Sequence, residues 1–293
     1  ITIKVILIVI LAIYLIIIKY NMKIFVTGAS GFVGKNFCDM AIKEGHYIFA
    51  PTRKKNLRKK KNLKWLYGDF NKNWKNELYK SDILVHFAAA GLNDDSYNNI
   101  FDVNVFKSLE LLNNAIKNNC KRWLIISTSS EYGLRNKKKI YKFTKNSNRI
   151  PDTEYGLSKA IFTDQAINLA KKNLCSIRIM RLFAIYGKGE HKKRLYPTLL
   201  NNKKKILHIK NPYETRDFTS VKFASELILD SCNFDKKKIK NYQIWHVSEN
   251  KPMMIKEFVR EILKLKKIKK KVKLNANNIE RFNHISDKKS VWK

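Results

Sequence analysis

Tyr155 and Lys159 are the residues in this sequence whose types and spacing could most directly do chemistry. They lie four positions apart in the segment YGLSK, so a helix would present both side chains on one face. A lysine ammonium favours the ionised form of a neighbouring phenol, and the pair therefore predicts a tyrosine that acts as an acid or a base. Taken alone, Y-x-x-x-K is common by chance, and two surface residues would be the better interpretation.

A cluster of hydroxyl side chains, residues 127–130, lies near the end of an apolar segment that spans residues 122–133 and is typical of a buried strand. One of these hydroxyls could hold a substrate oxygen within reach of Tyr155. No Ser-His arrangement is evident nearby in the sequence. We expect the closest carboxylate, Glu131, to point elsewhere because it lies one position further along the chain.

A glycine pattern near the start of the chain predicts a phosphate site. Residues 23–27 are typical of a buried parallel strand, Gly28, Gly31 and Gly34 follow with the spacing G-x-x-G-x-x-G, and residues 35–44 predict a helix. This order places the positive end of the helix against the turn, where a pyrophosphate would fit. An ordinary glycine-rich loop without a ligand is the alternative. Together with the tyrosine, lysine and hydroxyl groups, the pattern favours a nicotinamide dinucleotide, whose positive charge when oxidised would lower the tyrosine pKa further.

The remaining pattern alternates strands with helices and predicts an α/β fold: a Rossmann-type, doubly wound parallel sheet with its ligand at the carboxyl ends of the strands. Beyond residue 187 the pattern changes to short strands and two helices. We therefore expect a dinucleotide-binding domain over residues 22–186 and a small substrate-binding domain over residues 187–293, partly interleaved with the first. The other expected strands span residues 45–53, 62–70, 81–91 and 175–183, and the helices span residues 97–118, 155–173, 221–232 and 255–265.

The composition excludes several classes of site. The formal net charge is +36, but the basic runs occur all along the chain and lysine outnumbers arginine, which favours a solvated basic surface over a specific nucleic-acid site. The cysteines are scattered without a C-x-x-C pair, and the histidines show no ligand spacing, so we expect no metal site. A reducing cytoplasm is the natural location.

Residues 1–21 contain an apolar run flanked by Lys4 and Lys19 that is shorter than the roughly 20 residues of a spanning helix, though it could anchor the chain at a membrane. The competing interpretation is that the protein starts at Met22, because the first strand follows at once without a linker. We favour this second interpretation and expect a membrane partner only if residues 1–21 belong to the protein.

From residue 22 to about residue 265 the sequence resembles the extended short-chain dehydrogenase/reductases, in particular the NAD-dependent epimerase/dehydratase group that acts on nucleotide sugars. The resemblance rests on the ordered motifs TGASGFVG, GDF, HFAAAG, STSSEYG, YGLSK, RLFAIYG and RDFTSV. It implies a nucleotide-activated sugar as the substrate and an NAD or NADP cofactor, and we expect a homodimer.

Carried over by position, the resemblance implies roles for residues in these motifs. Tyr155 would be the acid or base, Lys159 would hold the nicotinamide ribose and lower the tyrosine pKa, and Thr128 would bind the reacting sugar oxygen. Ser129 would also contact the substrate, and Arg216 would contact its diphosphate. The implied cofactor site comprises Gly28, Gly31, Phe32 and Gly34 at the pyrophosphate, Asp69 and Phe70 at the adenine, and Ala88, Ala89 and Ala90 beside the nicotinamide ribose, together with Lys159.

Two further positions bear on the type of reaction. Ser129 and Ser130 replace the Asp-Glu pair that removes water in the 4,6-dehydratases of this family, and a hydroxyl cannot replace a carboxylic acid in that proton transfer. The second strand ends in Arg53, where NAD enzymes usually carry an acid, so a 2′-phosphate is favoured, although Arg53 could instead stack on adenine or belong to the adjoining basic loop. NADPH would favour a net reductase over a redox-neutral epimerase.

We therefore expect a cytoplasmic enzyme that catalyses 4-epimerisation or 4-keto reduction of a nucleotide sugar. The alternative is a non-catalytic Rossmann-fold protein with an RNA-binding or regulatory role, which the high positive net charge suggests. Retention of Thr128, Tyr155 and Lys159 argues against that alternative.

Overall fold

The computed structural model describes residues 21–91, 96–133, 142–201, 206–234, 242–275 and 283–292. Apart from Asn21, the expected leader lies outside these ranges. Among the described residues, no helix is long and apolar enough to cross a membrane.

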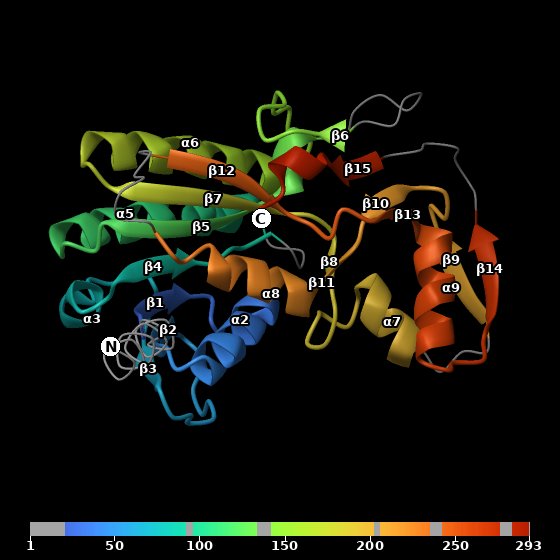
Figure 1. Cartoon of the computed structure of the whole chain (residues 1–293), viewed down its shortest axis with the longest axis horizontal. Helices are drawn as coiled ribbons and strands as arrows, with labels where there is room; N and C mark the ends of the chain where they lie inside the picture. Colours follow the sequence, from blue (N-terminus) through green and yellow to red (C-terminus); the bar gives the residue numbers. More distant parts are fainter. Residues whose placement is uncertain are drawn as a thin grey trace, which may run out of the picture.

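The centre of the molecule is a seven-stranded sheet in which every strand is parallel to its neighbours, as expected for a doubly wound Rossmann fold. Figure 1 shows this sheet on the side of the molecule that carries α2, α5 and α6. The predicted fold class is therefore confirmed. In spatial order the strands are β12 (Tyr242–Val247), β7 (Ser176–Leu182), β5 (Arg122–Thr128), β4 (Ile83–His86), β1 (Lys23–Thr27), β2 (Tyr47–Thr52) and β3 (Leu63–Tyr67).

Helices cover both faces of this sheet, and β1 shows why. Its residues alternate between two cores: Ile24 and Val26 belong to the core that includes residues of α2 and α8, whereas Phe25 belongs to the core that includes residues of α5 and α6. All three are fully buried. The helices of the first face are α2 (Phe32–Lys43) and α8 (Val221–Asp230), and those of the second are α3 (Lys75–Tyr79), α5 (Ser108–Lys117) and α6 (Glu154–Lys172).

The single helix expected over residues 97–118 is interrupted in the structure. It consists of α4 (Tyr97–Phe101), a π-helical turn η1 (Asp102–Lys107) and α5. Ser108 Oγ donates to the Val103 carbonyl at 2.8 Å, and the buried side chain of Asn104 bonds outside its own helix. Widened turns of this kind are frequent at functional sites.

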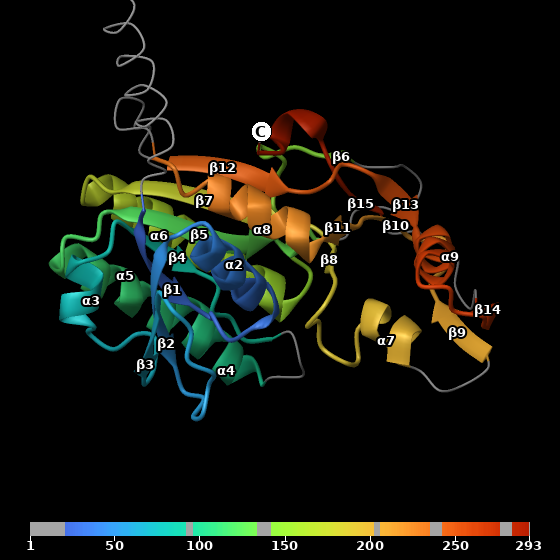
Figure 2. The ribbon, with the colours of Figure 1, turned by 60° about the horizontal axis from the view of Figure 1, so that its bottom comes forward.

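A smaller region lies beyond the carboxyl ends of the central strands, and both ribbon views show its α7, α9, β9 and β14 on the side away from the large sheet (Figures 1 and 2). Its own core joins residues of α7, β9 and α9, including Leu199, Ile209 and Phe258. The elements are α7 (Leu195–Asn201), α9 (Ile255–Leu265), the sheet β13 (Pro252–Met254), β10 (Thr215–Asp217), β15 (Asn283–Ser286) and β6 (Lys142–Phe143), and the pairs β11 (Thr219–Ser220) with β8 (Ile185–Tyr186) and β14 (Lys271–Asn275) with β9 (Ile206–Lys210).

The chain crosses between the two regions more than once. Strand β12 completes the large sheet beside β7, and α8 packs beside α2, although both follow residue 187 in the sequence. The short 3-10 helices η2 (Ser129–Tyr132) and η3 (Lys288–Ser290) complete the described elements. Division of the chain into domains at residue 187 stays a prediction.

Candidate active site

The glycine turn between β1 and α2 has the geometry of a phosphate cradle. Gly28 has a φ of +70°, and a Cβ there would lie 2.7 Å from the Ala88 nitrogen. A Cβ on Gly34 would lie 2.3 Å from the Gly28 carbonyl oxygen, so glycine lets α2 pack this closely. Gly31 is the N-cap of α2 without a side-chain hydrogen bond, and no acidic residue occupies the first turn. The helix dipole and unpaired N–H groups therefore face the turn, and these residues fit a dinucleotide pyrophosphate.

A second loop rests on the first turn of α2. Asn36 Nδ2 donates to the Lys188 carbonyl at 3.3 Å, and a Cβ on Gly189 would lie 3.7 Å from the Phe32 ring. Phe32 was predicted to contact the cofactor, and the structure places it between the glycine turn and this loop. The loop that follows β8 thus lies next to the predicted pyrophosphate position.

The predicted adenine end lies where β2 and β3 end side by side. Arg53 Nε is 3.6 Å from Asp69 Oδ1, and the two side chains are 79% and 45% exposed. An ion pair this exposed contributes little free energy, so Arg53 can leave Asp69 for another anion. Phe70 instead packs its ring on His86, with the ring centroids 5.5 Å apart. Phe70 therefore faces the core beside β4.

The loop after β4, residues 88–90, is held by a residue that the sequence analysis did not single out. Asn104 accepts from the Ala90 N–H at 2.8 Å, and its amide group donates to the Ala90 carbonyl and to Ser158 Oγ. Ser158 in turn donates to the Tyr155 carbonyl at 2.9 Å. Asn104 therefore fixes the alanine loop, which contains Ala88 and Ala89, relative to the helix that carries Tyr155. An asparagine in the middle of a helical pattern was the available signal.

Tyr155 lies in the first turn of α6, where this helix meets the carboxyl ends of β4 and β5. A Cβ on Gly156 would lie 2.5 Å from the Ser130 carbonyl oxygen, so glycine allows α6 to approach the end of β5. A Cβ on Gly91 would lie 3.3 Å from the Tyr155 ring. Thr153 caps the helix by accepting from the Gly156 N–H. The structure therefore brings the tyrosine, the alanine loop and the hydroxyl cluster together.

Lys159 lies one turn further along α6 and is almost completely buried. Its side chain is 2% exposed, and within the described parts of the chain no group pairs with its ammonium, which lies 5.5 Å from the Phe162 ring centroid. Burial lowers the pKa of Lys159 to about 8, while burial raises the pKa of Tyr155 to about 12. A buried cation without an anionic partner indicates a position prepared for a ligand.

The hydroxyl cluster at the end of β5 is directed by specific hydrogen bonds. Thr128 Oγ1 accepts from the Ser130 N–H at 3.1 Å and donates to Ser130 Oγ at 3.1 Å. Ser129 Oγ lies 3.3 Å from His284 Nδ1, in β15. The expectation that no Ser-His arrangement lies nearby was therefore wrong. These two residues are 155 positions apart, and only the packing of β15 near the end of β5 brings them together.

Glu131 points away from Thr128, Ser129 and Ser130 into a buried network, as expected. One of its oxygens accepts from Ser127 and Thr163, and the other lies 2.8 Å from Arg181 and 3.2 Å from Arg149. The carboxylate is completely buried and fully paired. Glu131 thus holds η2 against α6 and β7 and leaves no oxygen for a substrate.

Arg216 lies in β10, in the smaller region. Its guanidinium binds the buried Glu214 carboxylate at 2.7 Å, while its side chain remains 47% exposed. In the strand register Arg216 is the partner of His284. The predicted diphosphate-binding residue is therefore one strand away from the Ser129–His284 contact.

Glu190, in the loop after β8, was missed from the sequence. Its side chain is 8% exposed, its Oε1 lies 3.7 Å from Arg194 Nε, and its buried Oε2 has no hydrogen-bond partner in the described chain. Burial raises the pKa of Glu190 to about 7, against the opposing effects of Arg194 and of the Gly187 N–H. The charge of Arg194 also lowers the pKa of Tyr155, so this loop extends toward the tyrosine.

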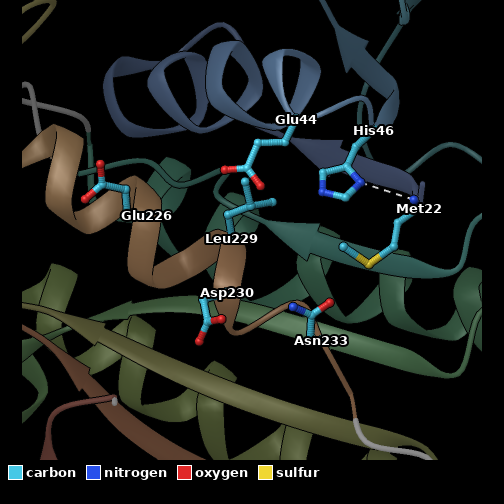
Figure 3. A pocket seen from close by; sticks show the side chains of 7 residues that line it. All are labelled: Met22, Glu44, His46, Glu226, Leu229, Asp230 and Asn233. Carbon is cyan, nitrogen blue, oxygen red and sulfur yellow. Dashed lines mark hydrogen bonds between the residues drawn. The ribbon is translucent and has the colours of Figure 1, made fainter. Parts of the chain in front are cut away.

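A cavity of about 280 Å³ lies at the opposite end of the sheet, where β1 and β2 begin (Figure 3). His46 Nδ1 accepts from the Met22 N–H inside it at 3.1 Å. None of the predicted site residues contributes to this cavity, so we place the active site elsewhere. The lining residues are Met22, Glu44, His46, Glu226, Leu229, Asp230 and Asn233.

Comparison with known families matches residues 24–239 to the NAD dependent epimerase/dehydratase family, which is more than half of the chain. The chain belongs to this family. Its members are enzymes of the extended short-chain dehydrogenase/reductase type, and the family description names NAD as the cofactor. The predicted resemblance is confirmed, and the glycine cradle and unpaired Lys159 agree with such a cofactor.

Curated relatives of the protein carry related names. A UDP-glucose 4-epimerase of Vibrio cholerae is 28% identical over 83% of this chain and 76% of its own length. A CDP-abequose synthase of Salmonella typhimurium is 27% identical over 80% of this chain and 78% of its own length. A GDP-6-deoxy-D-talose 4-dehydrogenase of Aggregatibacter actinomycetemcomitans is 26% identical over 71% of this chain and 69% of its own length.

Solved structures share the fold at lower identity. MoeE5 in complex with UDP-glucuronic acid and NAD superposes with a TM-score of 0.78 at 20% identity, covering 90% of this chain and 89% of that one. The UDP-glucose 4-epimerase of Thermotoga maritima superposes with a TM-score of 0.75 at 17% identity, covering 91% and 90%. These likenesses show that the fold is shared over about nine-tenths of this chain.

Proposed function

We propose that this member of the family transfers hydride to or from a ring carbon of a nucleotide-activated sugar, as a 4-epimerase or a 4-keto reductase. The observation that carries the proposal is Tyr155 beside a buried, unpaired Lys159 at the carboxyl ends of β4 and β5. The relatives named for UDP-glucose, CDP-abequose and GDP-6-deoxy-D-talose support a nucleotide sugar as the substrate.

In this proposal a nicotinamide cofactor, when bound, would supply or accept the hydride. Tyr155 removes the proton from the sugar hydroxyl when its carbon is oxidised and returns that proton on reduction. Burial is the largest of the effects that raise the pKa of Tyr155 to about 12, so the phenolate needs the stabilising positive charge of Lys159. Lys159 also holds the nicotinamide ribose, and Thr128 orients the reacting oxygen.

The remaining predicted residues divide between the two ligands. Gly28, Gly31, Phe32 and Gly34 hold the pyrophosphate, and Arg216 binds the diphosphate of the sugar nucleotide with Glu214 fixing its guanidinium. Arg53 contacts the 2′-phosphate of NADP after it leaves Asp69, which favours a net reductase. The contact with Asp69 supports a position of Arg53 beside the adenine ribose.

Dehydration is disfavoured by the same geometry. Ser129 and Ser130 occupy the positions where 4,6-dehydratases carry acids, and Glu131 is bound by two arginines instead of facing Thr128. Neither serine has the pKa needed for that proton transfer. We expect no 4-keto-6-deoxy product from any nucleoside diphosphate hexose, and comparable rates of dehydration and redox turnover would contradict this.

The proposal is tested by incubating the purified protein with NADPH, NADH or NAD⁺ and a panel of UDP-, CDP-, GDP- and dTDP-hexoses and their 4-keto derivatives. Chromatography separates the products. Consumption of NADPH with a 4-keto sugar identifies a reductase, and isomerisation without added reductant identifies an epimerase. If no member of the panel binds or reacts in the presence of cofactor, the proposed function is wrong.

A further inference from the structure

His284 joins the smaller region to the end of β5 through two hydrogen bonds. Its Nδ1 lies 3.3 Å from Ser129 Oγ, and its Nε2 lies 3.1 Å from the Gly133 carbonyl oxygen. The ring also packs edge-on against Phe143, with the centroids 5.5 Å apart. The imidazole, which extends from β15, is therefore held in one orientation against η2.

The chemistry of these partners determines the direction of both hydrogen bonds. A carbonyl oxygen can only accept, so His284 Nε2 carries the proton that is donated to Gly133. Burial lowers the pKa of His284, so the ring is neutral at pH 7 and Nδ1 is an acceptor. Ser129 Oγ must then donate its own proton to Nδ1. The hydroxyl proton of Ser129 is thereby directed away from any ligand.

The lone pairs of Ser129 Oγ are left for a donor from elsewhere. No described residue donates a hydrogen bond to this oxygen, whereas Thr128 Oγ1 already accepts from the Ser130 N–H. Ser129 lies directly after Thr128, at the end of β5, and His284 is the strand partner of Arg216. A sugar nucleotide held by Thr128 at one end and Arg216 at the other would pass this oxygen.

We propose that His284 is a positioning residue that makes Ser129 Oγ a hydrogen-bond acceptor for a hydroxyl of the bound sugar, so that the enzyme prefers a hydroxyl over a carboxylate at that position. A carboxylate can only accept, and it meets no donor at Ser129 in this arrangement. The inference rests on the proposed function, because it assumes that a nucleotide sugar occupies the site.

Two substitutions of similar size separate this role from a structural one. His284→Asn can place its amide oxygen where Nδ1 lies and keep the acceptor for Ser129, whereas His284→Gln keeps a donor near Gly133 and loses that acceptor. The probes are UDP-glucose and UDP-glucuronic acid, with UDP as the ligand that lacks the sugar, measured by calorimetry in the presence of cofactor. Where the panel identifies another nucleotide, its hexose, uronic acid and free diphosphate replace them.

We expect His284→Gln to weaken hexose binding about 3- to 10-fold, the range of one uncharged hydrogen bond, with unchanged binding of the free diphosphate. Binding of the uronic acid should stay equal or improve, because the freed Ser129 proton can now be donated to the carboxylate. His284→Asn should retain the preference of the wild type. Ser129→Ala should lose the preference, and adding His284→Gln to it should change nothing further.

The inference is overturned if His284→Gln has the same affinity as His284→Asn for each of the two sugar nucleotides. It is also overturned if Ser129→Ala keeps the wild-type ratio of hexose to uronic acid affinity. The second measurement decides the question even where the histidine variants do not fold. Failure of the proposed function has a different signature: the wild type then binds no free diphosphate and no sugar nucleotide of the panel, and the inference falls with it.

Discussion

Glu131 and Glu190 are both glutamates with buried side chains, and the partners of their carboxylates differ. The Glu131 carboxylate receives hydrogen bonds on both oxygens, including those from Arg149 and Arg181. Glu190 Oε1 lies 3.7 Å from Arg194 Nε, and Glu190 Oε2 has no hydrogen-bond partner among the described residues. Lys159 resembles Glu190, since its buried ammonium is also unpaired within the described chain.

This difference separates two layers of the molecule. The paired layer, around Glu131, lies beneath the end of β5 and holds η2, β7 and α6 together. The unpaired layer is our name for the Lys159 ammonium, which has no ion-pair partner in the described chain, and Glu190 Oε2, which has no hydrogen bond there, and we propose that the ligands contact this layer. Leaving a buried ionisable group unpaired costs stability, so such groups persist where a ligand supplies the missing partner.

The largest expected effect tests whether the unpaired layer carries the chemistry. Tyr155→Phe should lower turnover about 10²- to 10⁴-fold and leave cofactor binding nearly intact, because the lost hydroxyl acts on the substrate. Lys159→Ala should damage both turnover and cofactor binding. Steady-state rates and a cofactor titration measure this.

The matched control is the same substitution in the paired layer. The Tyr132 hydroxyl forms hydrogen bonds with two protein groups. It accepts from Arg181 Nη1 at 2.7 Å and lies 2.6 Å from His246 Nε2. Tyr132→Phe should therefore lower the free energy of unfolding by about 1–3 kcal/mol while the folded enzyme keeps most of its activity. Turnover of Tyr155→Phe within a few-fold of wild type would rule out its assigned role.

The next effect concerns stability. Glu131→Gln should lower the free energy of unfolding by about 3–5 kcal/mol, since it leaves Arg181 as a buried cation without a counter-charge. Urea unfolding monitored by circular dichroism measures this. Glu226→Gln, on the exposed surface of α8, serves as the control and should stay within about 0.5 kcal/mol of wild type. A loss for Glu131→Gln as small as that of the control would remove the distinction between the two layers.

Glu190→Gln should instead raise the free energy of unfolding at neutral pH. The pKa of Glu190 is raised from 4.5 to about 7 in the folded protein, so between these values the folded state holds this proton more tightly than the unfolded chain. The wild type therefore loses stability as the pH rises through this window, and the variant does not. At pH 7.5 the variant should be more stable by up to about 3 kcal/mol, with no difference near pH 4. Equal pH dependence of both proteins would show that folding does not raise the pKa of Glu190.

The smallest effect concerns Arg53, which we propose lies beside the adenine ribose of the cofactor. Arg53→Ala should weaken NADPH binding about 10-fold and NADH binding much less, since it removes a charge-assisted contact with a phosphate that NADH lacks. Cofactor fluorescence measures both affinities. Lys54→Ala, the next residue along, is the control. Equal losses for NADPH and NADH would show that Arg53 does not bind the 2′-phosphate, and the preference for a reductase would lose its support.

The fold was predictable from the sequence because its signals are local. The apolar strands, the G-x-x-G-x-x-G spacing and the four-residue interval from Tyr155 to Lys159 each depend on residues within one or two turns of each other. Strand β12 was not placed in the large sheet beforehand, because YQIWHV mixes polar and apolar residues as an edge strand does, and the π-helical turn around Asn104 gives no periodic signal of its own.

The sequence by itself therefore determined the class of fold, the glycine turn after the first strand and the four-residue interval from Tyr155 to Lys159, since each rests on spacing along one element. Only the tertiary structure decided that His284 meets Ser129, that Asn104 fixes the alanine loop to α6, and that Glu190 Oε2 is buried without a hydrogen bond in the described chain while Glu131 has several. The physical reason is that pairing and burial depend on which distant strands and loops become neighbours, and periodicity within one segment carries no information about its partners.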